Sequence, residues 1–289
     1  MPFGIDPAAW ETAGTLLCGS PRAAVVRSAL LPQGQREVRL RCERSMPFEF
    51  VSEFMQPFAS LWGARIETIV SDYDPSLSGA RRAPLGEDVL LLWVDWRLHT
   101  HLDPRVAARW IRSVISEARV SAARPAPVLV NDWPLGCGVD AGRDGDAWAT
   151  ALASELRTLS ADVADCHVLS LENLRARECL EFFDSRNDAV AHFPFSQRAA
   201  IHIARHLGAQ VLPSLLTPRL KAVVVDLDNT LWQGVLGEDG PDGLGIGPGH
   251  QALHAELTRL AQAGLMLAIC SRNDRRDVEA LFASGRVPG

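Results

Sequence analysis

Lysine is almost absent from this chain: Lys221 is the only one among 289 residues, so arginine carries nearly all of the positive charge. The 29 basic residues are outnumbered by 35 acidic ones, which gives a net charge of −6 at neutral pH. Proteins that bind nucleic acids generally present an excess of basic residues, because they are attracted to the phosphate backbone. The charge balance therefore argues against a nucleic-acid partner.

Long hydrophobic runs are also missing. No apolar stretch is longer than VLLLWV at residues 89–94, whereas a helix needs about 20 apolar residues to cross a bilayer. The first residues, MPFGIDPAAWETAG, lack the basic segment followed by an apolar one that marks a secretory signal. We therefore expect a cytoplasmic protein with no membrane partner.

The cysteines lack the spacing of a metal site or of a disulfide framework. No CxxC pair occurs among the six of them. Disulfide frameworks are typical of small secreted domains, and this chain is long and has no secretory signal. The sequence predicts six reduced thiols, at Cys18, Cys42, Cys137, Cys166, Cys179 and Cys270.

Before residue 217, apolar segments with the patterns of strands and helices alternate along the chain. Such alternation is typical of an α/β domain with a doubly wound parallel sheet. The prolines of segment 212–219 mark a domain boundary. We predict an amino-terminal extension at 1–45, an α/β domain at 46–216 and a second domain at 217–289. The predicted strands are 65–70, 88–96, 127–130 and 167–169, with two short strands at 23–26 and 37–40 in the extension. The predicted helices are 47–63, 103–120, 147–159 and 196–207.

The strongest chemical signal is the stretch KAVVVDLDNTLWQGVL at residues 221–236. Its valines predict a strand buried on both faces of a parallel sheet. Asp226 and Asp228 follow this strand, and residues i and i+2 of an extended segment point to the same side. Because carboxylates are costly to bury, the pair indicates a site. A polar turn capped by Asp228 or Asn229 explains either residue alone, but not the whole set.

The chemistry of this pair follows from its oxygens. Two carboxylates side by side suit Mg²⁺, so Asp226 and Asp228 are the predicted metal ligands. A carboxylate beside Mg²⁺ can attack a phosphorus atom, a role we assign to Asp226. Asp228 can donate a proton to the leaving oxygen and later accept one from water. Thr230 and Asn229 are predicted to bind phosphoryl oxygens.

A second apolar strand, LMLAIC at 265–270, ends in Ser271, Arg272 and Asn273. A hydroxyl at the end of a strand next to Asp226, followed by amides that open a helix, predicts a phosphate-binding cradle of Ser271 and Asn273. The segment 234–249 is rich in glycine and acidic residues. It predicts either a hairpin flap over the site or a surface turn.

The DLDNT sequence at 226–230 resembles the first motif, DxDxT, of the haloacid dehalogenase (HAD) superfamily of aspartyl-phosphate phosphatases and phosphotransferases. The longer run DLDNTLWQGVLGEDG is similar to the FkbH-like family of polyketide pathways, with Gln233 and Arg272 as departures. Ser271 matches the second motif of the superfamily. The resemblance implies a Rossmann-like domain with Asp226 as nucleophile, Asp228 as acid and base, and Mg²⁺ as cofactor.

The same resemblance implies a substrate and a partner. A glyceryl group is taken from the phosphorylated three-carbon substrate 1,3-bisphosphoglycerate, dephosphorylated and placed on an acyl carrier protein. In the family a cysteine is thought to hold this group as a thioester, a role that Cys270 can fill near a helix N-terminus. The alternative is structural: side chains alternate along a strand, so Cys270 points away from Ser271 as a buried apolar residue.

Two parts of the superfamily pattern are missing. No lysine follows Lys221, and the acids after Ser271 all lie on the adjoining helix. We therefore expect an incomplete HAD domain with weak metal binding, an open sheet edge and an uncovered face. The incomplete pattern leaves open a second function, that of a non-catalytic remnant which binds a carrier protein or acts as a scaffold.

The amino-terminal domain shows a fainter resemblance to the SGNH-hydrolase fold, which is similar to the corresponding half of FkbH-like proteins. Esterases of that fold need a Gly-Asp-Ser nucleophile and an Asp-x-x-His pair, and the nearest match to the first is Cys18-Gly19-Ser20. An SGNH-type esterase that depends on His192 is therefore a third possibility, which the missing nucleophile argues against. The candidate residues in this domain are Asp95, Asn131, Asp132, Asp188 and His192.

Overall fold

The structure, a computed structural model, describes residues 7–29, 31, 36–81, 85–120, 125–136, 145–178, 181–217, 221–285 and 287. The chain divides into two compact units, Met1–Thr217 (unit 1) and Pro218–Gly289 (unit 2). The division falls within the proline-bearing segment 212–219. No helix in the described ranges combines the length and the apolar character that a membrane span requires.

Unit 1 is built on a parallel sheet of five strands in the order β2-β1-β3-β4-β5. This order is doubly wound, because the chain steps outward from β1 to β2 and then returns to β3 on the other side of β1. The predicted α/β fold class is therefore confirmed. The strands are β1 (Arg36–Arg44), β2 (Ala64–Tyr73), β3 (Val89–Trp93), β4 (Val128–Asn131) and β5 (Cys166–Leu169).

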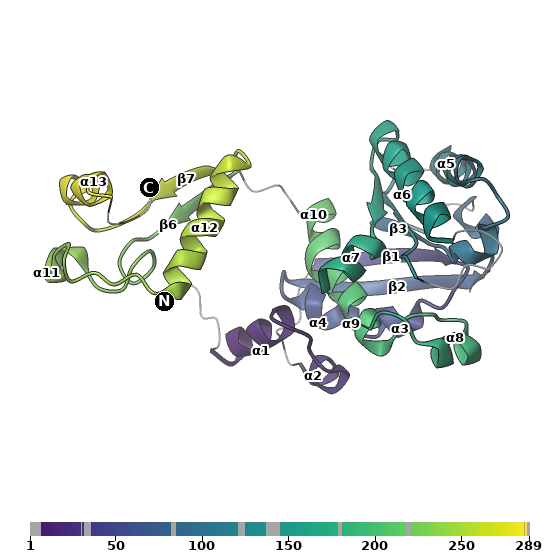
Figure 1. The fold of residues 1–289 in the computed structure, drawn as a ribbon, viewed down its shortest axis with the longest axis horizontal. Helices are drawn as coiled ribbons and strands as arrows, with labels where there is room; N and C mark the ends of the chain where they lie inside the picture. The colour runs from purple at the N-terminus through teal and green to yellow at the C-terminus, as the bar shows by residue number, and fades with distance from the viewer. Residues whose placement is uncertain are drawn as a thin grey trace. The chain divides into compact units, whose positions relative to one another are not determined.

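Helices cover both faces of this sheet (Figure 1). The long helices α5 and α6 pack against each other, whereas α3, α4 and α7 all contact α9. Between these layers all five side chains of β3 are buried, as its apolar sequence predicts. The helices of unit 1 are α1 (Pro7–Leu17), α2 (Ala23–Ser28), α3 (Glu49–Ser52), α4 (Met55–Ser60), α5 (Pro104–Val120), α6 (Gly145–Asp162), α7 (Leu171–Glu178), α8 (Ser185–Ala191), α9 (Gln197–His206) and α10 (Leu212–Leu216), with helical turns at Ser78–Arg81, Trp96–His99 and Leu207–Val211.

The prediction that residues 1–45 form an extension outside the domain is wrong. Strand β1 lies inside the sheet, between β2 and β3, and Leu16 and Val26 are buried in the same core. The strand predicted at 37–40 lies in β1, but the charged sequence REVRLRCER conceals its internal position. The strand predicted at 23–26 is wrong, because these residues form α2. Arg41 and Glu43 are both buried, and they form an ion pair with 2.8 Å between Nε and Oε1. A charged strand can be internal when its charges are paired.

The prediction of one helix over 47–63 is also wrong, because the structure has two short helices there, α3 and α4. Pro57 lies in the first turn of α4. Proline has no N–H to donate to an earlier carbonyl, so it is tolerated in the first turn but not inside a continuous helix. Phe54 and Phe58 of this segment are nevertheless buried as expected, whereas Phe50 is 41% exposed.

Unit 2 holds a sheet of two parallel strands, in which Val225 is paired with Ile269. Its buried residues, such as Leu227, Trp232 and Leu281, come from the segment after the first strand and from the last helix. The elements are β6 (Ala222–Val225), α11 (Leu236–Asp239), α12 (Pro248–Gln262), β7 (Met266–Ile269) and α13 (Arg275–Ala283).

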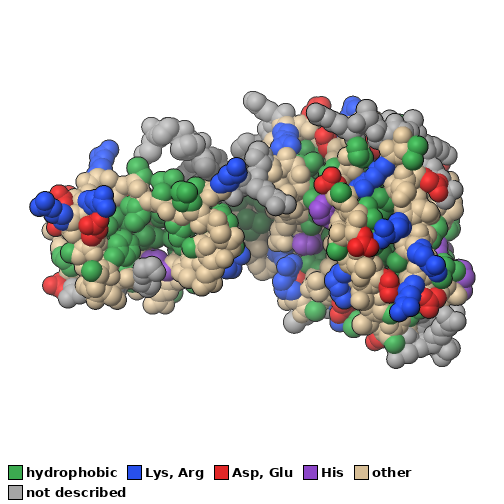
Figure 2. All heavy atoms as spheres, turned by 90° about the horizontal axis from the view of Figure 1, so that it is seen from above, with side chains coloured by type: hydrophobic (Ala, Val, Ile, Leu, Met, Phe, Trp, Pro, Cys, Tyr) green, Lys and Arg blue, Asp and Glu red, His purple; other side chains and the backbone are tan. Residues whose placement is uncertain are grey.

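The strands of unit 2 are not buried on both faces, contrary to our expectation from the valine run. Val224 is 64% exposed and Met266 is 67% exposed, and their register places them on one face of the sheet. On the other face, Val225 and Ile269 border α12 across a cavity of about 300 Å³. Figure 2 shows hydrophobic side chains on the visible face of unit 2. The exposure of Val224 and Met266 confirms the expectation of a sheet face that the described residues leave uncovered.

A polar substitution on the exposed sheet face, which carries Val224 and Met266, is expected to leave the unfolding free energy nearly unchanged. Met266→Gln should change the unfolding free energy of unit 2 by less than about 0.5 kcal/mol, because the side chain is already in water. The matched change Leu281→Gln, at a side chain that is only 2% exposed, should cost more than about 2 kcal/mol. Hydrogen exchange of the amides of unit 2 in the full chain measures both. A large loss for Met266→Gln would mean that this face is covered in solution.

Candidate functional site

The loop that follows β6 is closed by its own backbone. Asn229 adopts a left-handed conformation with φ of 56°, which asparagine tolerates better than most residues. Its Oδ1 accepts a hydrogen bond from Gly234 N at 3.0 Å, and its own N donates to Gly234 O at 3.3 Å. A side chain at Gly234 would place a Cβ 2.9 Å from Asp239 Oδ2. The segment DLDNTLWQG therefore forms one compact loop at the end of the strand.

Asp228 is held rigidly inside this loop. Its Oδ1 accepts hydrogen bonds from the indole Nε1 of Trp232 and from Leu236 N, both at 3.1 Å. Its Oδ2 accepts one from Asn273 Nδ2 at 2.8 Å. Trp232 is fully buried, so the donor it provides is fixed. Sequence reasoning missed this anchoring role of Trp232, although the residue lies within the motif stretch.

Asn273 joins this loop to the segment after β7. Its N and Nδ2 lie 3.2 and 3.1 Å from Ser271 Oγ, and its Nδ2 also reaches Asp228. Asp274 accepts a hydrogen bond from Arg276 N at 2.8 Å and so caps α13. The structure thus brings together three of the predicted site residues, Asp228, Ser271 and Asn273.

Asp226 is the available carboxylate of the pair. It is exposed, and it accepts no hydrogen bond from the described residues. Thr230 is half-buried one turn further along, where its N donates to Leu227 O at 3.1 Å. Among the described residues, the predicted nucleophile is therefore accessible and without a hydrogen-bond donor, whereas both oxygens of its neighbour Asp228 accept hydrogen bonds.

Cys270 lies at the same edge of the sheet as Asp226. Its N donates to Val225 O at 3.0 Å, and Val225 immediately precedes Asp226. The thiol is free and exposed. The expectation of a buried structural cysteine is therefore wrong, because the described residues do not cover this end of the sheet, where Ile269 is 51% exposed as well.

The donors at this edge suit Mg²⁺ in kind but are few in number. Carboxylate oxygens are the preferred ligands of this ion, which commonly keeps several waters. Asp226 offers free oxygens, while those of Asp228 already accept three N–H groups. In the described ranges, no group of three or more His, Cys, Asp or Glu side chains is arranged to hold a metal. Asp226 and Asp228 remain the predicted ligands.

The candidate residues at the carboxyl edge of the unit 1 sheet serve structural roles. Asp132 caps α7, because its carboxylate accepts hydrogen bonds from Ser170 Oγ at 2.6 Å and from Leu171 N at 2.7 Å. Burial raises the pKa of Asp132. Asn131 is fully buried. Its side chain accepts a hydrogen bond from Val94 N and donates one to Val94 O.

Asp188 and His192 do not form the pair that an SGNH-type esterase needs. Asp188 instead accepts a hydrogen bond from Arg97, which also pairs with Asp95. His192 is exposed and has a left-handed φ of 52° at the end of α8, where its backbone N donates to Asp188 O. The geometry of these residues gives no support to an esterase based on His192.

The similarity that comparisons with known proteins found is to solved structures. No protein-family model matches the chain, and no curated protein sequence matches it. Among solved structures, it is similar to the N-terminal part of the protein BF1531 from Bacteroides fragilis, described as containing a phosphatase domain complexed with Mg. The TM-score is 0.60 at 17% sequence identity, and the match covers 87% of this chain and 73% of the other.

This match concerns the fold. The covered share is larger than unit 1 alone, so the similarity extends into unit 2. The chain therefore shares the α/β fold of a protein that contains a phosphatase domain. At 17% identity, this similarity assigns no functional role to any residue of the chain.

Proposed function

We propose that unit 2 is a HAD-type phosphoryl-transfer domain in which Asp226 is the nucleophile. The observation that carries this proposal is the contrast within the DxDxT motif: Asp226 is exposed and unpaired, whereas Asp228 is oriented by three N–H donors. A nucleophile must reach its substrate, and an acid and base must be positioned precisely enough to pass a proton. The fold shared with a protein that contains an Mg-complexed phosphatase domain supports the same reading.

In this proposal, Asp226 attacks the phosphorus atom of a phosphate ester and forms an acyl phosphate, while the bond to the leaving oxygen breaks. Asp228 protonates that oxygen and then takes a proton from the water that hydrolyses the acyl phosphate. Thr230, Asn229, Ser271 and Asn273 bind phosphoryl oxygens. Mg²⁺, held by Asp226 and Asp228, supplies charge neutralisation when it is bound.

The finer proposal is an FkbH-like glyceryltransferase. It rests on the resemblance of DLDNTLWQGVLGEDG and on the exposed thiol of Cys270 at the same sheet edge as Asp226. The Cys270 thiolate would attack the acyl carbon of 1,3-bisphosphoglycerate and release the acyl phosphate group as inorganic phosphate. Asp226 would remove the remaining phosphate. The glyceryl group would then pass from the thioester to the thiol of an acyl carrier protein.

A second candidate is a non-catalytic domain that binds a carrier protein. It is favoured by the lack of a third acidic ligand near Asp226 among the described residues. This candidate predicts carrier binding without phosphate release.

Removal of the metal tests the proposal. Release of the ester phosphate of 1,3-bisphosphoglycerate, the one that Asp226 removes, is expected to fall about 100-fold or more in EDTA and to return with added Mg²⁺, because metal stabilisation of charge is worth several kcal/mol. Intact-mass analysis should detect a glyceryl adduct that Cys270→Ser loses and Cys18→Ser keeps, Cys18 being another exposed free thiol. Release that EDTA leaves unchanged would contradict the metal role. No release from folded protein would favour the carrier-binding candidate.

A further inference from the structure

Three polar side chains from separate segments of unit 1 lie in line. Ser20 follows α1, His202 lies on α9, and Glu178 ends α7. The distance between Ser20 Oγ and His202 Nε2 is 2.9 Å. On the other side of the imidazole, the distance between Nδ1 and Glu178 Oε2 is 2.8 Å. A hydroxyl, an imidazole and a carboxylate are therefore connected in the order that activates a serine.

The exposure of these groups suits such a role. The side chain of His202 is only 1% exposed and that of Glu178 is 17% exposed, whereas Ser20 is exposed at the surface. The base is thus shielded from water, while the hydroxyl that it contacts can meet a substrate. By contrast, Asp132 bonds Ser170 and the start of α7, and Asp188 bonds Arg97. In the described part of the chain, neither carboxylate contacts a histidine that in turn contacts an exposed hydroxyl.

Arg205 holds the two ends of this chain of contacts in place. Its Nη1 donates to Gly19 O at 2.6 Å, and its Nη2 donates to Glu178 Oε2 at 2.9 Å. Gly19 has a positive φ of 72°, a conformation that glycine adopts without strain, and it turns the chain after α1 toward α9. The position of Ser20 is therefore fixed by contacts distant in sequence.

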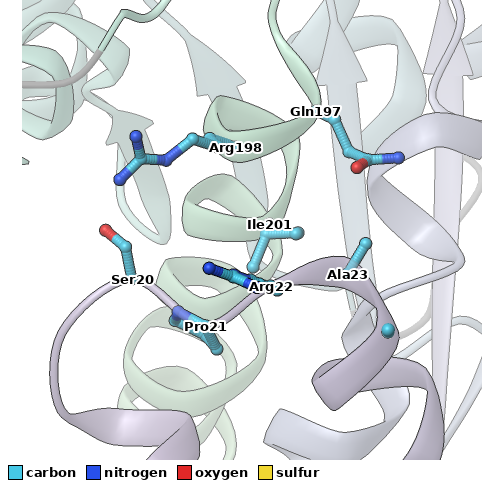
Figure 3. Close-up of a pocket in the computed structure, with 8 residues that line it drawn as sticks. Ser20, Pro21, Arg22, Ala23, Gln197, Arg198 and Ile201 are labelled. Atoms are coloured by element: carbon cyan, nitrogen blue, oxygen red, sulfur yellow. The ribbon is translucent and has the colours of Figure 1, made fainter.

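A cavity of about 520 Å³ opens beside Ser20. In Figure 3, Ser20 and Arg198 lie at one end of this cavity, and Gln197 and Ala23 lie at the opposite end. Arg22 lies in the middle. Ile201 contributes an apolar side chain to the lining. Arg22 and Arg198 are exposed, and neither guanidinium pairs with another of the described residues. The cavity thus combines an apolar surface with two available positive charges.

We propose that Ser20, His202 and Glu178 form a second catalytic site, which hydrolyses carboxylic esters or thioesters of small acids that carry an additional negative charge. Ser20 Oγ attacks the carbonyl carbon and its proton passes to His202 Nε2. The bond to the leaving oxygen or sulfur breaks as His202 returns that proton to it. Water then attacks the acyl group on Ser20, again through His202, and releases the acid and the free serine.

The tautomer of His202 separates this role from a structural one. In the catalytic arrangement Nδ1–H donates to Glu178 and Nε2 accepts from Ser20. In the structural arrangement Nδ1 accepts from Arg205 Nη2, which is 2.9 Å away, and Nε2–H donates to Ser20. Burial, together with the charge of Arg205, lowers the pKa of His202. The imidazole is therefore neutral at physiological pH, as a general base must be.

A fluorophosphonate probe tests the proposal on the full chain. Ser20 Oγ is expected to attack its phosphorus atom with loss of fluoride, and peptide mass analysis should place the label on Ser20. Ser20→Ala should abolish labelling and reduce hydrolysis of mono-p-nitrophenyl succinate at least about 1,000-fold. The matched control is Ser28→Ala, an exposed serine on α2 whose hydroxyl donates to Val25 O and, among the described residues, makes no other hydrogen bond. It should change neither readout.

Two variants probe the supporting residues. Glu178→Gln is expected to lower the rate about 100-fold or more, and to move the acidic limb of the pH profile further below 6.5. This shift follows because the Glu178 carboxylate raises the pKa of His202, against the lowering by Arg205 and Arg198. Arg198→Ala should raise KM for the succinate ester but not for p-nitrophenyl acetate. EDTA should affect none of these rates, unlike phosphate release.

Clear outcomes would overturn the proposal. A folded wild-type chain whose Ser20 stays unlabelled would establish the structural arrangement of His202. Labelling of Ser20 that persists at full rate in Glu178→Gln would equally exclude a working triad. Because His202 is buried, His202→Gln is less decisive, and the wild-type label and Glu178→Gln carry the test.

Discussion

Asp226→Asn is expected to reduce metal-dependent phosphate release at least about 1,000-fold, because an amide cannot act as the nucleophile. The shape of the side chain is kept. Asp226 is exposed and accepts no hydrogen bond from the described part of the chain, so the substitution removes no contact of the fold. Its effect should therefore appear in activity alone, with an unchanged unfolding transition.

The matched control is Asp277→Asn, which removes an exposed carboxylate on the neighbouring helix α13. Phosphate release from 1,3-bisphosphoglycerate should be within a factor of about two of the unchanged chain, because an exposed charge outside the site contributes little. Equal activity of Asp226→Asn and the unchanged chain would exclude Asp226 as nucleophile. An equal loss in both variants would point to a general effect of charge on unit 2.

Asn131→Ala is expected to cost unit 1 roughly 2–5 kcal/mol of unfolding free energy, because it leaves buried backbone groups without partners. The Oδ1 of Asn131 accepts from Val94 N at 2.7 Å, and its Nδ2 donates to Val94 O at 2.9 Å. The side chain thus continues the hydrogen bonding between β3 and β4 where the two strands separate. Asn131 is fully buried, so water cannot replace these bonds.

Tryptophan fluorescence during denaturation of the full chain measures this loss, since seven of the eight tryptophans lie in unit 1. Asn187→Ala serves as control: its Nδ2 makes one hydrogen bond, to Phe195 O at 3.2 Å, and its loss should cost about 1 kcal/mol. A small effect of Asn131→Ala would show that this residue is not structural. It would return Asn131 to the list of functional candidates.

Local patterns in the sequence predicted the α/β class and much of its content. The uninterrupted apolar run of β3 specified a central strand, and Ser196 marked the start of α9, where its Oγ accepts from Ala199 N at 3.1 Å. These signals work because helix caps and buried strands depend on neighbouring residues. The DxDxT spacing likewise placed Asp226 and Asp228 at the end of a strand before any geometry was known.

Patterns that depend on distant residues were not readable. The charges of β1 are compatible with the interior only because Arg41 and Glu43 pair within the fold. The apparent helix over 47–63 is interrupted at residues 53–54, so that Pro57 falls in the first turn of a new helix. Exposure of the Cys270 thiol and of the face that carries Val224 and Met266 also depends on what packs there. The apolar sequence of a strand does not show whether another element packs over it.

The sequence by itself determined the α/β class, the central strand β3 and the carboxylates at the end of β6. Only the tertiary structure decided which polar side chains meet. It paired Asp188 with Arg97 instead of His192. It also brought Ser20 Oγ to within 2.9 Å of Nε2 of His202, which lies 182 residues further along the chain. The physical reason is that propensity and periodicity act over a few residues, whereas a site is assembled by packing that joins segments remote in sequence.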